Sequence, residues 1–401
     1  MITIFELQDI IESQLLRLAK IDNGMERKFK SDITTSHALI ISGIRRCGKS
    51  TLMRQLMHAD KANKVFLNFE DPRLAAFTFS DFERLGKYAE EKHINHFYLD
   101  EIQNISGWEN FVRFKLDEGY QVTITGSNAS LLSVELGTKL TGRHITRELF
   151  PFSYAEYLQF TTQKEDAQSL QKYLHTGGFP EYILSENEEV LQHVFNDILL
   201  RDIAVRYQIK QTRIIRSLAV FILSNSGNRM SANALRKQFE IASSSSINEY
   251  LNYLQDSYLF LPVSKFSYSL KAQQVNPKKW YAIDSGLITV NAQSFTPDYG
   301  RLLETVVFLH LRRNFSEIYY FLEKKECDFV VFRNSKIIQT IQVCFELNSM
   351  NKEREIAGLV EAMDYFGQKE GWIVTFNQED LVSLFDKTIH ILPFWKWYEN
   401  L

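Results

Sequence analysis

Short apolar runs alternate with longer segments of helical spacing in the first third of the chain. Residues 4–20 place apolar side chains along one helix face, and the turn residues Asp22-Asn23-Gly24 end that segment. Four later runs have the continuous apolar character of strands that are buried on both faces: residues 38–42, 65–69, 97–99 and 122–125. Because helical or loop segments separate these runs, we expect a parallel sheet that is covered by helices on both sides.

The pattern changes beyond Pro151. Residues 156–210 have mostly helical spacing, whereas residues 211–275 show three helical segments and then an apolar extended run, which is the outline of a winged helix. Residues 276–401 show a helix, three strands, a second helix and two more strands. We therefore predict an α/β chain with four parts: a parallel-sheet domain at 1–155, a helical lid or linker at 156–210, a winged-helix-like domain at 211–275 and a second α/β domain at 276–401.

Residues 43–50 fit the pattern G-x-x-x-x-G-K-[ST] in full, between a predicted strand and a predicted helix. Its glycines let backbone N–H groups point inward around an anion, and the helix N-terminus adds its positive end. Lys49 would reach the β- and γ-phosphates, and the Ser50 hydroxyl would ligate Mg²⁺. The loop therefore predicts a P-loop NTPase sheet that binds ATP and Mg²⁺. The predicted nucleotide-binding residues are Gly43, Ile44, Arg45, Arg46, Cys47, Gly48, Lys49, Ser50 and Thr51.

Two acidic residues, Asp100 and Glu101, directly follow the third apolar run. Ligands of open α/β sheets bind at the carboxyl ends of the strands, which is where these two side chains are expected. Asp100 would hold Mg²⁺ through water, and Glu101 would polarise the water that attacks the γ-phosphate. The alternative is an acidic pair that simply ends a strand in solvent.

Polar residues also follow the fourth apolar run. Ser127 and Asn128 are candidates for contact with the γ-phosphate, and we assign Asn128 to the catalytic set; a turn without nucleotide contact is the alternative. Arg143 is our candidate for stabilising charge in the transition state, either in cis or from a neighbouring subunit. An arginine that faces solvent would fit the same sequence.

Cys47 lies in the phosphate loop, beside Arg45 and Arg46 and at the start of a helix. These features lower the pKa of a thiol and raise its reactivity. We therefore expect N-ethylmaleimide to block nucleotide binding and ATP to protect against it. The alternative is a small neutral side chain that fills the loop.

The motifs of this chain resemble those of prokaryotic proteins that combine an AAA-like ATPase domain with a DUF4143 domain. The resemblance rests on residues 41–52, 69–72, 99–103, 125–128, 140–143, 149–153, 281–287 and 304–308, and it covers nearly the whole chain. It implies an ATPase module that is joined to a winged-helix region and to a C-terminal domain related to PD-(D/E)xK nucleases.

The C-terminal element order fits a restriction-endonuclease-like core, whose active site needs acids for Mg²⁺ and a lysine that supports the attacking water. Glu304 and Asp328 would supply two acids. The third strand offers Gln342 and Cys344 where an E-x-K pair is required. Glutamine is a neutral and weaker metal ligand, and cysteine cannot replace the charge of the lysine. We therefore expect a degenerate domain that serves for binding or as a scaffold.

Basic residues are moderately enriched in the predicted winged helix. Residues 211–265 contain six of them, Arg213, Arg216, Arg229, Arg236, Lys237 and Lys265, against three acids. Lys271, Lys278 and Lys279 would extend the basic side. Duplex DNA is therefore a candidate partner through the helix at residues 244–257, with weak and salt-dependent binding. A winged helix used only for packing or for protein contacts is the alternative.

The charge balance, the cysteine content and the apolar stretches of the chain exclude some classes of protein. The 401 residues are 45% hydrophobic, and 46 Lys and Arg against 49 Asp and Glu give a net charge of −3, which excludes a polycation that coats nucleic acid. Three cysteines without a C-x-x-C pair, and the lack of a long apolar stretch, predict a cytoplasmic protein without a membrane span. We favour an ATP-hydrolysing nucleotide switch, with an ATP-dependent nuclease and an ATP-gated adaptor for a protein partner as alternatives; a homo-oligomer fits all three.

Overall fold

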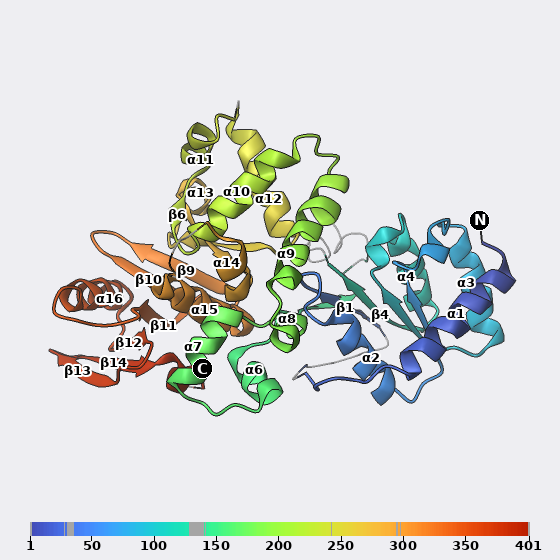
Figure 1. Ribbon diagram of the computed structural model, residues 1–401, viewed down its shortest axis with the longest axis horizontal. Coiled ribbons are helices and arrows are strands. Elements are labelled where there is room, and N and C mark those ends of the chain that lie inside the picture. Colours follow the sequence, from blue (N-terminus) through green and yellow to red (C-terminus); the bar gives the residue numbers. More distant parts are fainter. Residues whose placement is uncertain are drawn as a thin grey trace. The chain divides into compact units, whose positions relative to one another are not determined.

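The computed structural model describes residues 2–27, 29, 36–127, 140, 142–241, 243–293, 296 and 298–399. The chain divides into two compact units, Met1–Leu149 (unit 1) and Phe150–Leu401 (unit 2), which Figure 1 colours from blue to red along the sequence. In the described part of the chain, no helix has the length and apolar character needed to cross a membrane.

Unit 1 contains a five-stranded sheet in the order β2-β3-β4-β1-β5, and every strand pair in it is parallel. Its strands are β1 (Ala38–Ser42), β2 (Lys64–Asn68), β3 (His96–Asp100), β4 (Gln121–Gly126) and β5 (His144–Glu148). The predicted α/β sheet is therefore confirmed, and its four predicted runs are β1 to β4. The strand β5 was not predicted, because this edge strand mixes polar and apolar residues that are all only half-buried.

Helices surround this sheet in Figure 1. They are α1 (Ile4–Ala19), α2 (Lys49–Ala59), α3 (Asp81–Glu91) and α4 (Trp108–Asp117), with short 3₁₀ turns at Pro72–Leu74 and Ile102–Asn104. All five residues of β1 and of β3 are buried, as expected for central strands with both faces covered. The ends of these two strands carry the phosphate loop and the acidic pair, so the sheet positions both.

Unit 2 begins with a helical segment. Its elements are α6 (Tyr154–Thr161), α7 (Ala167–Thr176), α8 (Pro180–Ser185), α9 (Glu188–Asp197) and a π-helical stretch at Ile198–Val205. The next elements are α10 (Thr212–Ser224), β6 (Arg229–Met230), α11 (Ala232–Gln238), α12 (Ser244–Asp256), β7 (Phe260–Lys265), α13 (Leu270–Val275), β8 (Lys278–Ala282) and α14 (Ser285–Asn291).

The rest of unit 2 follows the predicted order of elements. It consists of α15 (Tyr299–Asn314), β9 (Glu317–Leu322), β10 (Glu326–Arg333), β11 (Lys336–Val343), α16 (Lys352–Phe366), β12 (Glu370–Thr375), β13 (Asp380–Leu384), β14 (Lys387–Pro393) and α17 (Phe394–Trp397). The strand β13 had no counterpart in the predicted pattern.

One nine-stranded sheet runs through unit 2, in the order β13-β14-β12-β11-β10-β9-β7-β8-β6. The boundary predicted at residue 275 falls between β7 and β8, which pair with each other, and β7 also pairs with β9. Shared backbone hydrogen bonds therefore join residues 211–275 to the segment that follows them. Residues 150–401 form one compact unit.

Candidate functional site

The phosphate loop connects β1 to the first turn of α2 in unit 1. Gly48 has φ 102°, a left-handed conformation that favours glycine, and it directly precedes the helix. A Cβ atom at Gly43 would lie 2.1 Å from the Leu149 carbonyl oxygen. Both glycines of the motif are thus required by the path of the backbone, which brings the loop to the N-terminus of α2, where the positive end of the helix favours an anion.

Lys49 is only 4% exposed and points back into the loop. Its Nζ donates to the carbonyl oxygens of Gly43 and Ile44, at 3.1 Å each, and lies 3.5 Å from Oε1 of Glu101. Burial alone would lower the pKa of Lys49, but Glu101, Cys47 and Asp100 together outweigh it and raise the pKa. The Lys49 ammonium is therefore fixed in the phosphate loop by two carbonyl oxygens and by the Glu101 carboxylate.

Ser50 and Asp100 meet beside this ammonium. The Ser50 hydroxyl donates to Oδ2 of Asp100 at 2.8 Å, and the Thr125 hydroxyl donates to Oδ1. Burial, together with the neighbouring Glu101 carboxylate, raises the pKa of Asp100 to about 6. A hydroxyl and a buried carboxylate in contact form an oxygen donor set that suits Mg²⁺. These residues fit the predicted metal, which would neutralise the buried charge.

Glu101 adopts a left-handed backbone conformation, with φ 52°, immediately after β3. Its backbone N–H donates to the Thr125 hydroxyl oxygen at 3.1 Å, and its carboxylate accepts from the Gln103 side chain. Burial works to raise the pKa of Glu101, yet the Lys49 ammonium, the Gln103 hydrogen bond and the Arg45 guanidinium together hold it below the ordinary value. An ionised carboxylate is the state that a general base requires. Thr125 and Gln103, which hold this acidic pair, had no role in the sequence analysis.

The two other predicted catalytic residues do not join this group. Asn128 lies outside the described residues. The role predicted for Arg143 in cis is wrong, because the backbone N–H of Ala38, at the start of β1, donates to the Arg143 carbonyl oxygen. That is the opposite edge of the sheet from the phosphate loop, about 16 Å away at the rise of a five-residue strand. The Arg143 guanidinium instead pairs with Asp117 at 2.7 Å.

The prediction of a reactive thiol is also wrong. Cys47 is fully buried, and its Sγ donates to the Leu149 carbonyl oxygen at 3.3 Å. Burial raises the pKa of this thiol above its ordinary value, although Lys49 and Arg27 act to lower it. The structure therefore favours the alternative, in which Cys47 fills the loop. Arg27, whose guanidinium donates to the Cys47 carbonyl oxygen at 3.2 Å, belongs to no motif and was missed.

A cavity of about 450 Å³ opens beside Ser50 and Asp100 within unit 1. It is lined by Gln14, Arg17, Leu18, Ile21, Ser50, Arg54, Phe66, Asn68, Glu70, Asp71, Pro72, Arg73 and Asp100. At its edge Arg45 of the phosphate loop pairs with Glu70, which follows β2, at 2.9 Å. Of the acidic pair, Asp100 therefore lines this cavity beside Ser50, and Glu101 is not among the lining residues.

Comparison with known proteins agrees with this geometry. The profile of a family described as "AAA domain" matches residues 35–158. An uncharacterized protein of Methanocaldococcus jannaschii is 33% identical, over 95% of this chain and 92% of the relative. An uncharacterized protein of Haemophilus influenzae is 30% identical, over 80% and 86% respectively. The chain belongs to this family of AAA-domain proteins. Members of the AAA class generally bind a nucleotide with Mg²⁺.

The assignment of a DUF4143 domain to the C-terminal part of the chain is not supported. Residues 167–297 match a domain of unknown function, DUF8612, and not the DUF4143 domain that the resemblance implied. Among solved structures, the Holliday junction branch migration motor RuvB of Thermotoga maritima is 16% identical with a TM-score of 0.31, over 64% of this chain and 87% of that one. Cdc6p of Pyrobaculum aerophilum is 13% identical with a TM-score of 0.27, over 57% and 82%.

Proposed function

We propose that this AAA-domain protein binds ATP with Mg²⁺ and hydrolyses it, and that it works as a nucleotide switch. One observation carries the proposal: Lys49, Ser50, Asp100 and Glu101, from two separate segments, converge within hydrogen-bonding or ion-pairing distance at one sheet edge. An ammonium, a metal-binding pair and an ionised carboxylate are the groups that phosphoanhydride hydrolysis needs in this arrangement.

Each residue has a separate task in this proposal. The loop amides and Lys49 bind the β- and γ-phosphates, and Ser50 and Asp100 hold Mg²⁺, which when bound neutralises the charge that develops on the phosphate oxygens. When Lys49 turns to the phosphates, its pairing with Glu101 weakens. Glu101 is then available to accept a proton from water, and Gln103 and Thr125 keep it in position.

Phosphate release from ATP tests this function. The purified chain should release phosphate in the presence of Mg²⁺ and stop when EDTA removes the metal. A non-enzymatic adaptor would instead bind ATP tightly with negligible turnover. That result would contradict hydrolysis and would favour an adaptor whose binding to a partner is controlled by ATP. Repeating the assay with duplex and single-stranded DNA tests whether turnover is coupled to nucleic acid.

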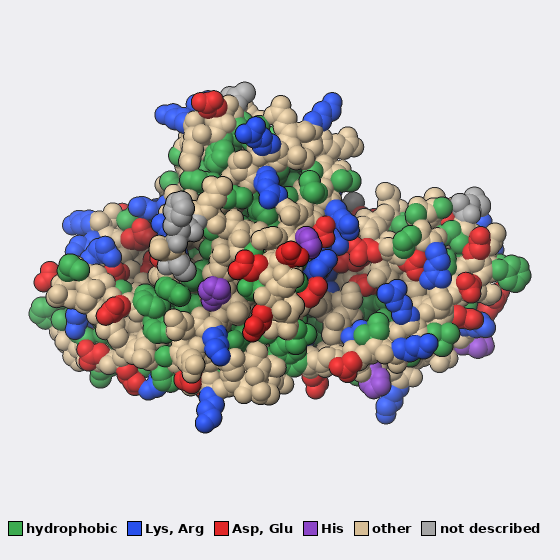
Figure 2. Space-filling view, viewed as in Figure 1, with side chains coloured by type: hydrophobic (Ala, Val, Ile, Leu, Met, Phe, Trp, Pro, Cys, Tyr) green, Lys and Arg blue, Asp and Glu red, His purple; other side chains and the backbone are tan. Residues whose placement is uncertain are grey.

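We further propose that residues 212–282 form a winged helix that contacts duplex DNA weakly. The order α10-β6-α11-α12-β7-α13-β8, with β8 pairing both β6 and β7, supports the winged-helix assignment. Much of the predicted basic side is engaged within the unit. Arg229 pairs with Glu326, Lys265 pairs with Glu323, and Lys279 is buried. On the face shown in Figure 2, Lys and Arg are interspersed with Asp and Glu.

DNA affinity should therefore fall steeply with salt. With about three phosphate contacts, affinity should drop roughly 40-fold between 50 and 200 mM salt. Fluorescence anisotropy of a labelled duplex measures this, and the double substitution Arg236→Ala with Lys237→Ala should weaken binding further at low salt. Affinity that does not change with salt would argue against a phosphate-driven contact and in favour of a winged helix used for protein contacts.

A further inference from the structure

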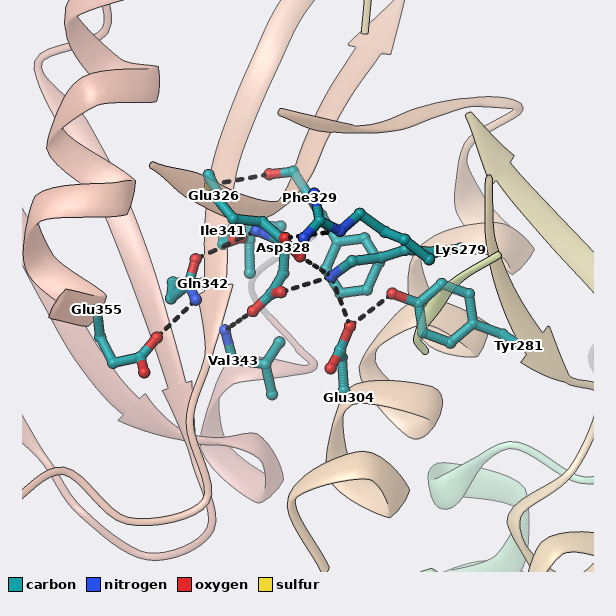
Figure 3. A network of polar contacts seen from close by, with 12 residues as sticks. Lys279, Tyr281, Glu304, Glu326, Asp328, Phe329, Ile341, Gln342, Val343 and Glu355 are labelled. Carbon is teal, nitrogen blue, oxygen red and sulfur yellow. Dashed lines mark hydrogen bonds and ion pairs between the residues drawn. The ribbon is translucent and has the colours of Figure 1, made fainter. Parts of the chain in front are cut away.

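Lys279 occupies an unexpected place in unit 2. Its place in the sequence predicts a basic surface residue, but on β8 the Lys279 side chain is only 3% exposed. Figure 3 shows its ammonium among carboxylates from two other elements, α15 and β10. Nζ lies 2.7 Å from Asp328 Oδ1, 2.7 Å from Glu326 Oε1 and 3.0 Å from Glu304 Oε1.

Two of these carboxylates also accept hydrogen bonds from other groups of unit 2. Oδ2 of Asp328 accepts from the backbone N–H of Val343 at 3.0 Å, and the Tyr281 hydroxyl donates to Glu304 at 2.6 Å. Gln342, in the position that would need an acid, accepts from the Asp328 backbone N–H and donates to Glu355. The acids therefore point at one central position, and an ammonium fills that position.

The location matters because Glu304 and Asp328 are the two residues predicted to hold a metal in a nuclease-like core. Three carboxylate oxygens lie within 3.0 Å of one point. Ca²⁺ binds oxygens at about 2.3–2.6 Å with flexible geometry, so only a small contraction separates this arrangement from a cation site. Among the described residues, no group of three or more His, Cys, Asp or Glu is arranged to hold a metal as the chain stands.

We infer that the Lys279 ammonium is the resident cation of this cluster and takes the position that a divalent metal would occupy in a nuclease site. Burial would lower the pKa of Lys279, but Asp328, Glu304, Tyr281 and Glu326 together outweigh it and hold the pKa well above its ordinary value, which favours the charged ammonium. The cluster then joins β8, α15 and β10 without a metal, and unit 2 uses its nuclease-like core as a scaffold.

Lys279→Met tests this inference in the full chain without nucleotide. Four of the five tryptophans lie in unit 2, so tryptophan fluorescence follows mainly its thermal unfolding. Loss of the buried cation should lower Tm by roughly 10 °C. Ca²⁺ should then raise the Tm of the variant by about 5 °C or more, while it shifts the wild type by less than about 1 °C. Lys278→Met, at the neighbouring and more exposed residue, is the matched control and should change Tm little.

A second variant keeps the inference testable if Lys279→Met accumulates poorly. Adding Asp328→Asn removes one of the uncompensated carboxylates, so the double variant should be more stable than Lys279→Met alone. The inference is overturned if Lys279→Met is as stable as Lys278→Met, or if the second substitution gives no gain. It is also overturned if Ca²⁺ stabilises the wild type as strongly as the variant, because the native cluster would then be a metal site.

Discussion

Replacing Lys49 by alanine should abolish detectable ATP hydrolysis and lower ATP affinity by roughly 100- to 10,000-fold. The estimate follows from the loss of two charge-assisted hydrogen bonds to the phosphates, at about 1.5–3 kcal/mol each. Residues 43–51 contain no lysine besides Lys49, so no second ammonium in the loop can substitute for it. Titration with a fluorescent ATP analogue measures the affinity, and phosphate release measures the turnover.

The matched control for this prediction is Lys61→Ala, which removes an exposed lysine of the same unit and should leave both quantities unchanged. Circular dichroism should show that both variants are folded. If folded Lys49→Ala binds ATP as tightly as the wild type, the nucleotide does not use this loop and the assignment of the site is refuted.

Glu101→Gln should separate binding from hydrolysis. Glutamine has nearly the same shape as glutamate but cannot accept the proton of the attacking water, so turnover should fall by about 10²- to 10⁴-fold. Affinity for ATP should change only a few-fold, because Lys49, Ser50 and the loop amides are retained. Single-turnover phosphate release and equilibrium binding of the same preparation measure the two quantities.

The control here is Glu83→Gln, which changes an exposed glutamate on α3 and should have wild-type turnover. Wild-type turnover in Glu101→Gln would mean that another residue accepts the proton. Loss of binding in that variant would instead mean that Glu101 acts through the position of Lys49, with which it pairs at 3.5 Å.

The parts of the site that are coded locally could be predicted from the sequence. The phosphate loop needs a strand, two glycines and a helix in direct succession, and all of them are visible in residues 38–59. The acidic pair was predicted because a buried strand ends at Asp100, and the carboxyl ends of parallel strands meet at one sheet edge. Thr125 and Gln103 were missed because their role depends on contacts with Asp100 and Glu101.

The wrong predictions depended on pairings between distant segments. Whether Arg143 is near the loop is decided by the parallel pairing of β5 with β1, which places it at the amino edge of the sheet. The burial of Cys47 is completed by Leu149, at the end of that same strand. Neither the register nor the presence of β5 could be inferred from a mixed polar and apolar edge strand.

Lys279 shows the same limitation within unit 2. In the sequence it stands beside Lys278, and the two suggested a basic surface. Successive residues of a strand point to opposite faces of the sheet, so the pair divides: Lys278 stays partly exposed, and Lys279 is buried among the acids of α15 and β10. Only the continuation of the sheet from β8 through β7 to β9 and β10 brings those acids near it.

A structure of Glu101→Gln with ATP and Mg²⁺ tests the central claim most directly. It should show the β- and γ-phosphates within about 3 Å of Lys49 Nζ and of the loop amides. Mg²⁺ should lie between Ser50 and the γ-phosphate, with the residue-101 side chain facing the γ-phosphorus across one water molecule. A nucleotide bound elsewhere on the chain, or a residue-101 side chain turned away from the γ-phosphate, would contradict the proposed hydrolysis.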